Sequence, residues 1–278
     1  MLIQCRRGWR PDVPAACALM LLAALLLALP AAAADEATSR RPRIEAEGHP
    51  WQAFGRVNNQ GSGFCTGVLV GPAVVLTAAH CLYNRRAGSW ADAGRIHFVA
   101  GYDNRGYAFH ARAGRYLVAP GYDPSKTERS PAEAARDWAV VTLERAAPAR
   151  LGYIGVARFR KGTALPPAPA FSLAGYGRDR PHALSAHQGC RLLGWDAGFD
   201  LLLHDCQAVG GISGAPILGR WNGHFLVYAL HVGRSEVDGT RLGGAVPAGD
   251  FFDAVRAATG QTVAREQALD ILPGRAGE

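Results

Sequence analysis

Short apolar runs separated by glycine, proline, asparagine and aspartate make up most of the chain from Trp51 onward. They recur at spacings of roughly 8 to 25 residues with little helical periodicity between them, which is typical of β-barrels and β-sandwiches. The sequence therefore predicts an all-β fold. The expected strands are Val68–Val70, Val74–Thr77, Ile96–Ala100, Arg115–Val118, Trp138–Leu143, Phe171–Ala174, Leu201–Leu203, Ala215–Leu218 and Phe225–Leu230.

Two segments interrupt this pattern. The alanine-rich stretch Ala132–Arg136 predicts a helical turn. Asp250–Ala258 carries apolar residues spaced by four and by three, as on one face of a helix, and Gly260 is placed to end that helix.

The first residues have the three parts of an export signal. Arg6, Arg7 and Arg10 give a positive start, the apolar run Ala15–Leu29 follows, and Ala32–Ala34 supplies small residues for cleavage. A retained membrane anchor is the alternative, but a spanning helix needs about 20 apolar residues and this run is shorter. We therefore predict a signal peptide over residues 1–34, no stable membrane anchor after its removal, and a periplasmic or secreted protein.

The charge of the chain points to no polyanionic partner. The formal net charge is +7, but the basic residues are scattered among acids, which favours an ordinary solvated surface over nucleic-acid binding.

Four cysteines remain after the predicted signal peptide, an even number that is typical of disulfides in an oxidising compartment. Of the three possible connectivities we favour Cys65–Cys81 and Cys190–Cys206. Each closes a loop of about 16 residues, worth on the order of 3 kcal/mol in the chain-entropy account. The chain has no CxxC pair, so we expect no structural metal site.

Hydrolysis of an amide by serine requires a hydroxyl, a base, a group that orients the base, and donors for the oxyanion. His80 is the candidate base. An apolar, β-branched run leads into Ala78 and Ala79, whose small side chains allow a tight turn, and a disulfide at Cys81 would fix the imidazole. An isolated histidine would more often be structural, and it is this context that favours catalysis.

Asp137 is the candidate orienting carboxylate. It comes directly before the apolar run that starts at Trp138, which would place it at the rim of a buried strand within reach of the histidine. Asp103 and Asp123 compete for this role. Both stand in turn-like sequences, so we favour Asp137.

Ser213 is the candidate nucleophile. Glycines on both sides of it allow the backbone to curl, so that the N–H groups of Gly211 and Ser213 can converge as oxyanion donors. Ala215 stands where a Gly-x-Ser-x-Gly elbow would need glycine. Together with the absence of βαβ alternation, this argues against an α/β-hydrolase.

Taken together, the segments around His80, Asp137 and Ser213 resemble the trypsin/chymotrypsin-like serine peptidase family. The resemblance runs from about Trp51 to Ala258, and the order His, Asp, Ser is the order of the family. It implies two six-stranded antiparallel β-barrels with the triad between them, followed by a C-terminal helix. It also implies a serine endopeptidase that acts through an acyl-enzyme.

The resemblance defines the expected domains. Residues 35–46 are a linker or pro-segment, residues 47–160 a first barrel carrying His80 and Asp137, and residues 161–260 a second barrel carrying Ser213. The stretch Pro148–Pro169, rich in alanine, glycine and proline, is the expected crossover. Residues 261–278 are expected to be a flexible tail.

Ile212 departs from the family pattern, which has aspartate before the nucleophile. In trypsin-like enzymes that carboxylate pairs with an α-amine released by proteolytic activation, and isoleucine cannot form the pair. Arg43–Ile44 looks like an activation cleavage site. Because the acid it would engage is missing, we predict that activity does not depend on a free amine at Ile44.

The residues of the substrate pocket are harder to assign. In the family the residue six before the serine lies at the base of the primary pocket, and here it is Gln207, which gives no counter-charge for lysine or arginine. Asp205 is close enough for a shifted loop to supply one. His231 is similar to the histidine with which bacterial glutamyl endopeptidases read an acidic side chain, and a wall residue without that role is the alternative. With an ordinary pKa of about 6.5, it would favour acidic substrates most below that pH.

The sequence thus predicts an enzyme that takes a protein or peptide substrate and needs no cofactor and no metal. The alternative is a peptide-binding protein on a peptidase fold that is catalytically weak or inactive. Ile212 and Ala215 keep this alternative open, because they could misshape the oxyanion loop.

Overall fold

The computed structural model describes residues 41–126, 130–165, 171–196, 200–237 and 239–260. The predicted signal peptide, the first half of the predicted linker (residues 35–40) and the predicted tail lie outside these ranges. None of the described helices is long and apolar enough to cross a membrane.

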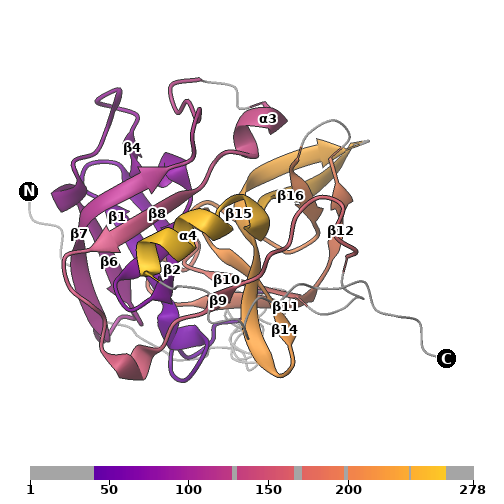
Figure 1. The fold of residues 1–278 in the computed structure, drawn as a ribbon. Coiled ribbons are helices and arrows are strands. Elements are labelled where there is room, and N and C mark those ends of the chain that lie inside the picture. The colour runs from indigo at the N-terminus through magenta and orange to yellow at the C-terminus, as the bar shows by residue number, and fades with distance from the viewer. Residues whose placement is uncertain (1–40, 127–129, 166–170, 197–199, 238, 261–278) are drawn as a thin grey trace, which may run out of the picture. The chain divides into compact units, whose positions relative to one another are not determined.

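Six antiparallel strands close into a barrel in the first half of the chain, drawn in indigo to magenta in Figure 1. Their order around the barrel is β1-β2-β3-β8-β7-β6, and β6 pairs with β1 to close it. The strands are β1 (Phe54–Asn59), β2 (Gly63–Gly71), β3 (Val74–Thr77), β6 (Ile96–Ala100), β7 (Phe109–Val118) and β8 (Ala139–Leu143). A short hairpin, β4 (Tyr83–Asn84) with β5 (Ser89–Trp90), projects from it.

The second half forms an eight-stranded sheet with the order β11-β10-β14-β15-β16-β13-β12, and β9 pairs in parallel with β15. The sheet curls like half a barrel. The strands are β9 (Gly155–Val156), β10 (Phe171–Gly175), β11 (Ser185–Cys190), β12 (Leu192–Trp195), β13 (Leu202–His204), β14 (Pro216–Trp221), β15 (His224–Val237) and β16 (Thr240–Pro247). A closed barrel followed by this curled sheet confirms the predicted all-β, chymotrypsin-like fold class.

Two α-helices lie within the described residues at the predicted places. α3 (Pro131–Ala134) starts at Ser130, whose side chain accepts a hydrogen bond from the Glu133 N–H, the usual way to satisfy a free donor at a helix start. α4 (Phe252–Thr259) ends at Gly260, which adopts the left-handed conformation. The 3₁₀ turns are η1 (Trp51–Ala53), η2 (Ala79–Leu82), η3 (Ala93–Arg95), η4 (Ala149–Leu151) and η5 (Ala248–Asp250).

The C-terminal helix covers the first barrel, although it follows the last strand of the second sheet. α4 packs against β2, β3 and β8, and Figure 1 shows it in yellow lying across the front of the molecule. This cover explains why β3 is buried along its whole length, with apolar residues on both faces. The helix therefore supports the strands that lead to His80 and Asp137.

Candidate active site

The strand register of the first barrel brings His80 and Asp137 together. β3 and β8 are antiparallel neighbours with Thr77 opposite Ala139, so the chain leaves β3 toward His80 at the edge where Asp137 enters β8. His80 Nδ1 lies 2.6 Å from Asp137 Oδ2, and the His80 backbone N–H donates to Oδ1 at 2.8 Å. An ionised carboxylate can only accept, so the proton is on Nδ1 and Nε2 is left with its lone pair.

The Asp137 carboxylate is fully buried, whereas the His80 side chain is 14% exposed. The competing acids are used elsewhere. Asp103 accepts hydrogen bonds from Arg105 and Gly106 within its own turn, and Asp123 accepts from Ser125. The structure thus brings Asp137 to the imidazole and leaves the two turn aspartates in local hydrogen bonds.

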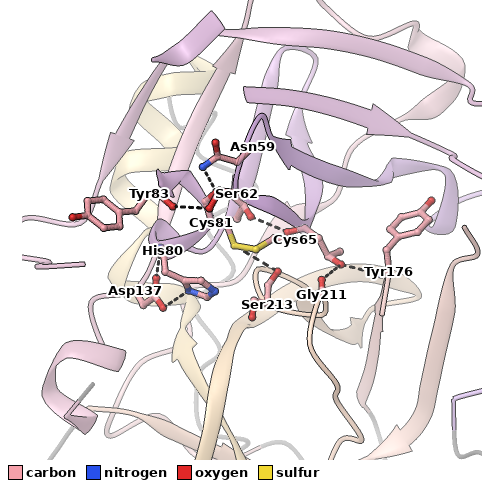
Figure 2. The surroundings of a disulfide bond; sticks show 12 residues. Asn59, Ser62, Cys65, His80, Cys81, Tyr83, Asp137, Tyr176, Gly211 and Ser213 are labelled. Carbon is pink, nitrogen blue, oxygen red and sulfur yellow. Dashed lines mark hydrogen bonds and ion pairs between the residues drawn. A yellow bond between two sulfur atoms is a disulfide. The ribbon is translucent and has the colours of Figure 1, made fainter. Parts of the chain in front are cut away.

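The loop that carries Ser213 is attached to the first barrel through β2. The Ser213 carbonyl accepts from the Thr66 N–H at 2.9 Å, and Cys81 Sγ lies 3.9 Å from the same oxygen. Figure 2 shows the imidazole of His80 between the Asp137 carboxylate and Ser213. Three stretches far apart in the sequence therefore meet at one place.

Thr66 is a supporting residue that sequence reasoning missed. Its hydroxyl donates to the Gly211 carbonyl at 3.0 Å and accepts from the Tyr176 N–H at 2.9 Å. Its carbonyl accepts from the Thr77 hydroxyl at 2.8 Å. The only sequence signal was its place beside Cys65, which carries no chemistry by itself.

Gly211 and Gly214 are required by the shape of the loop. Gly211 has φ +95° and Gly214 has φ +80°, a region that side chains rarely adopt. A Cβ on Gly211 would lie 2.5 Å from the Tyr176 carbonyl oxygen, and one on Gly214 would lie 2.4 Å from that of Thr66. A side chain at Gly211 would push the loop away from Tyr176, and one at Gly214 would push it away from Thr66 of β2.

The loop around Ser213 uses some of its N–H groups in hydrogen bonds and leaves others without an acceptor in the described part of the chain. The N–H groups of Ile212, Gly214 and Ala215 donate to carbonyls of Val209, His231 and Ile212. Within the ranges that the structure describes, no acceptor takes the N–H of Gly211 or of Ser213. These are the two donors that the sequence pattern assigned to the oxyanion.

Both disulfides are present with the predicted pairing. Cys65–Cys81 and Cys190–Cys206 each bridge residues 16 apart in the sequence. The first lies beside His80, and the three residues form a cluster with potential metal-ligating atoms within 4.8 Å of one another. Metal binding to cysteine uses the thiolate, which a disulfide sulfur lacks, so this cluster does not fit a metal.

Ile212 is fully buried in the apolar core of the second sheet, where an aspartate would need a cationic partner. Ile44 stands in an internal backbone pairing, because its N–H donates to the Leu184 carbonyl at 2.9 Å. Neither residue is placed to form an amine–carboxylate pair.

Gln207 and Asp205 do not form a pocket that would favour a lysine or arginine side chain of a substrate. Gln207 is exposed, and its N–H donates to His187 Nδ1 at 2.9 Å. Asp205 is held by Arg191, which donates from its Nε to Oδ2 at 2.8 Å and from its backbone to Oδ1 at 2.6 Å. A carboxylate already paired with arginine gives little charge to a bound lysine or arginine.

His231 is buried in β15 and hydrogen-bonded to a second buried histidine, His204, with His204 Nε2 and His231 Nδ1 3.0 Å apart. The Cys206 N–H donates to His204 Nδ1 at 3.2 Å. An amide N–H is always a donor, so His204 Nδ1 is unprotonated and its proton is on Nε2. His204 Nε2–H donates to His231 Nδ1, so Nδ1 of His231 is unprotonated. Neutral His231 therefore carries its own proton on Nε2.

Burial decides the charge of this pair. Desolvation, followed by the nearby His80 and Arg234, lowers the pKa of His231 to about 3, and burial lowers that of His204 well below its ordinary value. The expectation of a histidine titrating near 6.5 is therefore replaced by a neutral N–H donor at neutral pH, because the ring is only 3% exposed.

Comparisons with known proteins agree with this architecture. The Trypsin family matches residues 40–199, which is more than half of the chain. A stretch of 108 residues is 26% identical to the glutamyl endopeptidase of Bacillus licheniformis and covers 38% of this chain but only 31% of that protein. A solved structure of a Glu endopeptidase in complex with MPD superposes with a TM-score of 0.63 at 19% identity, over 80% of this chain and 97% of that one. This chain therefore belongs to the trypsin/chymotrypsin-like family of serine peptidases.

Proposed function

We propose that the protein is a serine endopeptidase in which Ser213 is the nucleophile, His80 the base and Asp137 the group that orients the base. The observation that carries the proposal is the buried Asp137 carboxylate, bonded to His80 Nδ1 at 2.6 Å and to the His80 backbone N–H at 2.8 Å. The contact with Nδ1 fixes the tautomer in which Nε2 can accept the serine proton, and the contact with the backbone N–H orients the carboxylate.

The steps follow from this arrangement. The Ser213 oxygen bonds to the scissile carbonyl carbon as its proton passes to His80 Nε2, and the carbonyl oxygen becomes an oxyanion between the N–H groups of Gly211 and Ser213. This tetrahedral intermediate then collapses: the C–N bond breaks, and His80 Nε2 gives the proton to the leaving amine. Water then hydrolyses the acyl-enzyme by the same route. Loss of one oxyanion donor costs about 3 to 4 kcal/mol in such enzymes.

Labelling with a fluorophosphonate probe tests this proposal. We expect covalent modification of Ser213 in the wild-type protein, none in Ser213→Ala, and cleavage of denatured casein by the wild type only. The alternative of an inactive peptide-binding protein predicts no labelling together with peptide binding that Ser213→Ala retains. That result would end the enzyme proposal.

We further propose that the enzyme prefers an acidic residue before the scissile bond. The support is the hydrogen-bond chain from the Cys206 N–H through His204 to His231, which fixes the His231 proton on Nε2. No acceptor among the described residues takes that N–H, so it is available to a substrate carboxylate. The relative from Bacillus licheniformis is named as a glutamyl endopeptidase, in line with this preference.

Matched peptides with glutamate, glutamine or alanine before the cleaved bond test the preference. Because the donor is neutral, we expect glutamate to be cleaved fastest at pH 7 as well as at pH 6. A bound carboxylate favours the charged imidazole and would raise the pKa of His231, so the preference should grow as the pH falls. Equal cleavage of the three peptides at pH 6 would refute it.

We also propose that the protein is exported to the periplasm or secreted. Two disulfides are typical of oxidising compartments, and the N-terminal sequence has the parts of a signal peptide. N-terminal sequencing of the protein recovered from cell fractions tests this. We expect a chain beginning at Asp35 outside the cytoplasm, and an uncleaved chain in the membrane would contradict it.

A further inference from the structure

Arg41 is a buried arginine for which the catalytic proposal has no use. Its side chain is only 2% exposed, although it stands in the polar stretch that the sequence predicts as a linker or pro-segment. The guanidinium forms an ion pair with the Asp179 carboxylate and donates from Nη1 to the Ser185 hydroxyl at 3.0 Å. A buried guanidinium is costly unless it is paired in this way, so the contact calls for an explanation.

The backbone around Arg41 is fixed to the second sheet. Arg43 forms an antiparallel bridge with Ser185, and the Ile44 N–H donates to the Leu184 carbonyl at 2.9 Å. The Pro42 carbonyl accepts from the Ala186 N–H at 3.1 Å. The segment thus adds to the edge strand β11, and the guanidinium reaches inward from an anchored backbone.

Asp179 belongs to a loop, residues 177–180, that contacts residues 210–215. We call residues 210–215 the oxyanion loop, because they carry the proposed oxyanion donors Gly211 and Ser213. The Arg178 N–H donates to the Gly210 carbonyl at 2.7 Å. A Cβ built on Gly177 would lie 2.7 Å from the Val209 side chain and 3.2 Å from Arg41 Nη1, so the guanidinium, this loop and the start of the oxyanion loop are in close packing. The path from Arg41 to the Gly210–Gly211 peptide therefore runs through one ion pair and one backbone hydrogen bond.

We propose that Arg41 is a positioning residue that sets the oxyanion loop through Asp179 and Arg178. In this protein the Arg41 guanidinium holds the oxyanion loop through residues 177–180, and the buried side chain of Ile212 anchors the same loop in the apolar core. The loop therefore needs no ion pair with a free α-amine at Ile44. The inference rests on the proposed function, because it concerns the Gly211 and Ser213 donors of that same site.

The planar guanidinium suits this role better than an ammonium group would. Its donors are fixed in one fork, so Arg41 can hold the Asp179 carboxylate and the Ser185 hydroxyl at set angles. Asp179 is 42% exposed, and the solvent-facing carboxylate gains a fixed position mainly from this pairing. Without the Arg41 side chain, the loop would keep the Arg178–Gly210 hydrogen bond and the one from Arg180 Nη1 to the Arg41 backbone carbonyl. It would lose the ion pair that fixes Asp179.

The test compares Arg41→Met with Arg43→Met, a control two residues away. The Arg43 side chain is 44% exposed, and its Nη2 lies 3.8 Å from Glu45 Oε1 in a long surface ion pair. We expect kcat and the rate of fluorophosphonate labelling of Ser213 to fall about a hundredfold in Arg41→Met, as when one oxyanion donor is lost. KM should change less than threefold, because the substrate pocket is intact. Arg43→Met should behave as the wild type.

A loss of folding is separated from a loss of positioning by two further measurements. Near-ultraviolet circular dichroism establishes that each variant is folded, and Arg41→Ala is assayed with added ethylguanidinium, which should restore part of kcat. If Arg41→Met does not fold, Arg41→Lys is decisive, and a fall of at least tenfold in its kcat with native dichroism supports the proposal.

A folded Arg41→Met, or failing that a folded Arg41→Lys, with wild-type kcat and labelling rate overturns the positioning role. The positioning role is also overturned if kcat falls, added ethylguanidinium does not restore it, and KM changes in proportion to kcat. These outcomes are distinct from failure of the proposed function, in which the wild type itself would not be labelled at Ser213.

Discussion

Replacing His204 by phenylalanine would test the buried histidine pair most directly. The change keeps a planar ring but removes both nitrogens, so the Cys206 N–H and His231 Nδ1 each lose their partner. His204 is fully buried and His231 is 3% exposed, so water cannot replace the lost contacts at low cost.

The size of the effect follows from these two groups. A buried polar group left without a partner costs about 1–3 kcal/mol, which gives about 2–6 kcal/mol for both. For a chain of this length each kcal/mol lowers the melting temperature by roughly 2–4 °C. We therefore expect His204→Phe to melt at least about 4 °C below the wild type.

The same substitution should also change specificity. Without the donor from His204, the His231 proton is no longer restricted to Nε2, so the ratio of kcat/KM for glutamate over glutamine peptides should fall. The assays are thermal unfolding by circular dichroism and paired peptide kinetics. His224→Phe, an exposed histidine at the start of β15, is the control and should change the unfolding free energy by less than about 0.5 kcal/mol. A His204→Phe protein with the wild-type melting temperature and the wild-type ratio would refute the reasoning.

Three further predictions concern the rest of the site. Asp137→Asn should lower kcat by about 10⁴, since the amide no longer fixes the histidine tautomer, and a loss below tenfold in steady-state kinetics would contradict the assignment. The double variant Cys190→Ser with Cys206→Ser should lose about 3 kcal/mol in urea unfolding, and an unchanged midpoint would show that the bridge is not structural. Unfolding free energy should fall as the pH drops from about 6.5 toward 3, by about 1.4 kcal/mol per pH unit for each buried histidine, because the unfolded chain binds protons that folded His204 and His231 exclude. Urea titrations at pH 7 and pH 5 measure this, and equal stability at both would contradict it.

The strands that sequence alone predicted are short segments in which apolar and β-branched residues dominate. β3 and β6 have the expected bounds, and the predicted helix near the C-terminus differs from α4 by two residues at its start and one at its end. Among the strands that were not predicted, β1 and β16 contain glycine and polar residues where apolar ones were sought. Their glycines are needed for close packing, as at Gly243, where a Cβ would fall 2.0 Å from the His204 ring. Such contacts are made between distant strands, and no local pattern reveals them.

The candidate site divides in the same way. His80, Asp137 and Ser213 each stand in a recognisable local sequence, and the spacing of the cysteines indicated their pairing. Thr66 and Arg41 contact partners far away in the chain, as the 138 residues between Arg41 and Asp179 show. His204 contacts His231, which lies on another strand 27 residues further along. A polar stretch before the first strand looks like a linker until the acid that pairs with its arginine is known.

The proposed catalytic groups are mounted on different halves of the molecule. His80 and Asp137 belong to the closed barrel, whereas Ser213 stands in the loop that leads into β14 of the open sheet. A slight parting of the halves would separate hydroxyl from imidazole while every strand stayed paired. Enzymatic turnover should therefore vanish at a lower denaturant concentration than the β-sheet signal does, and it should return on dilution as long as the two bridges stay oxidised.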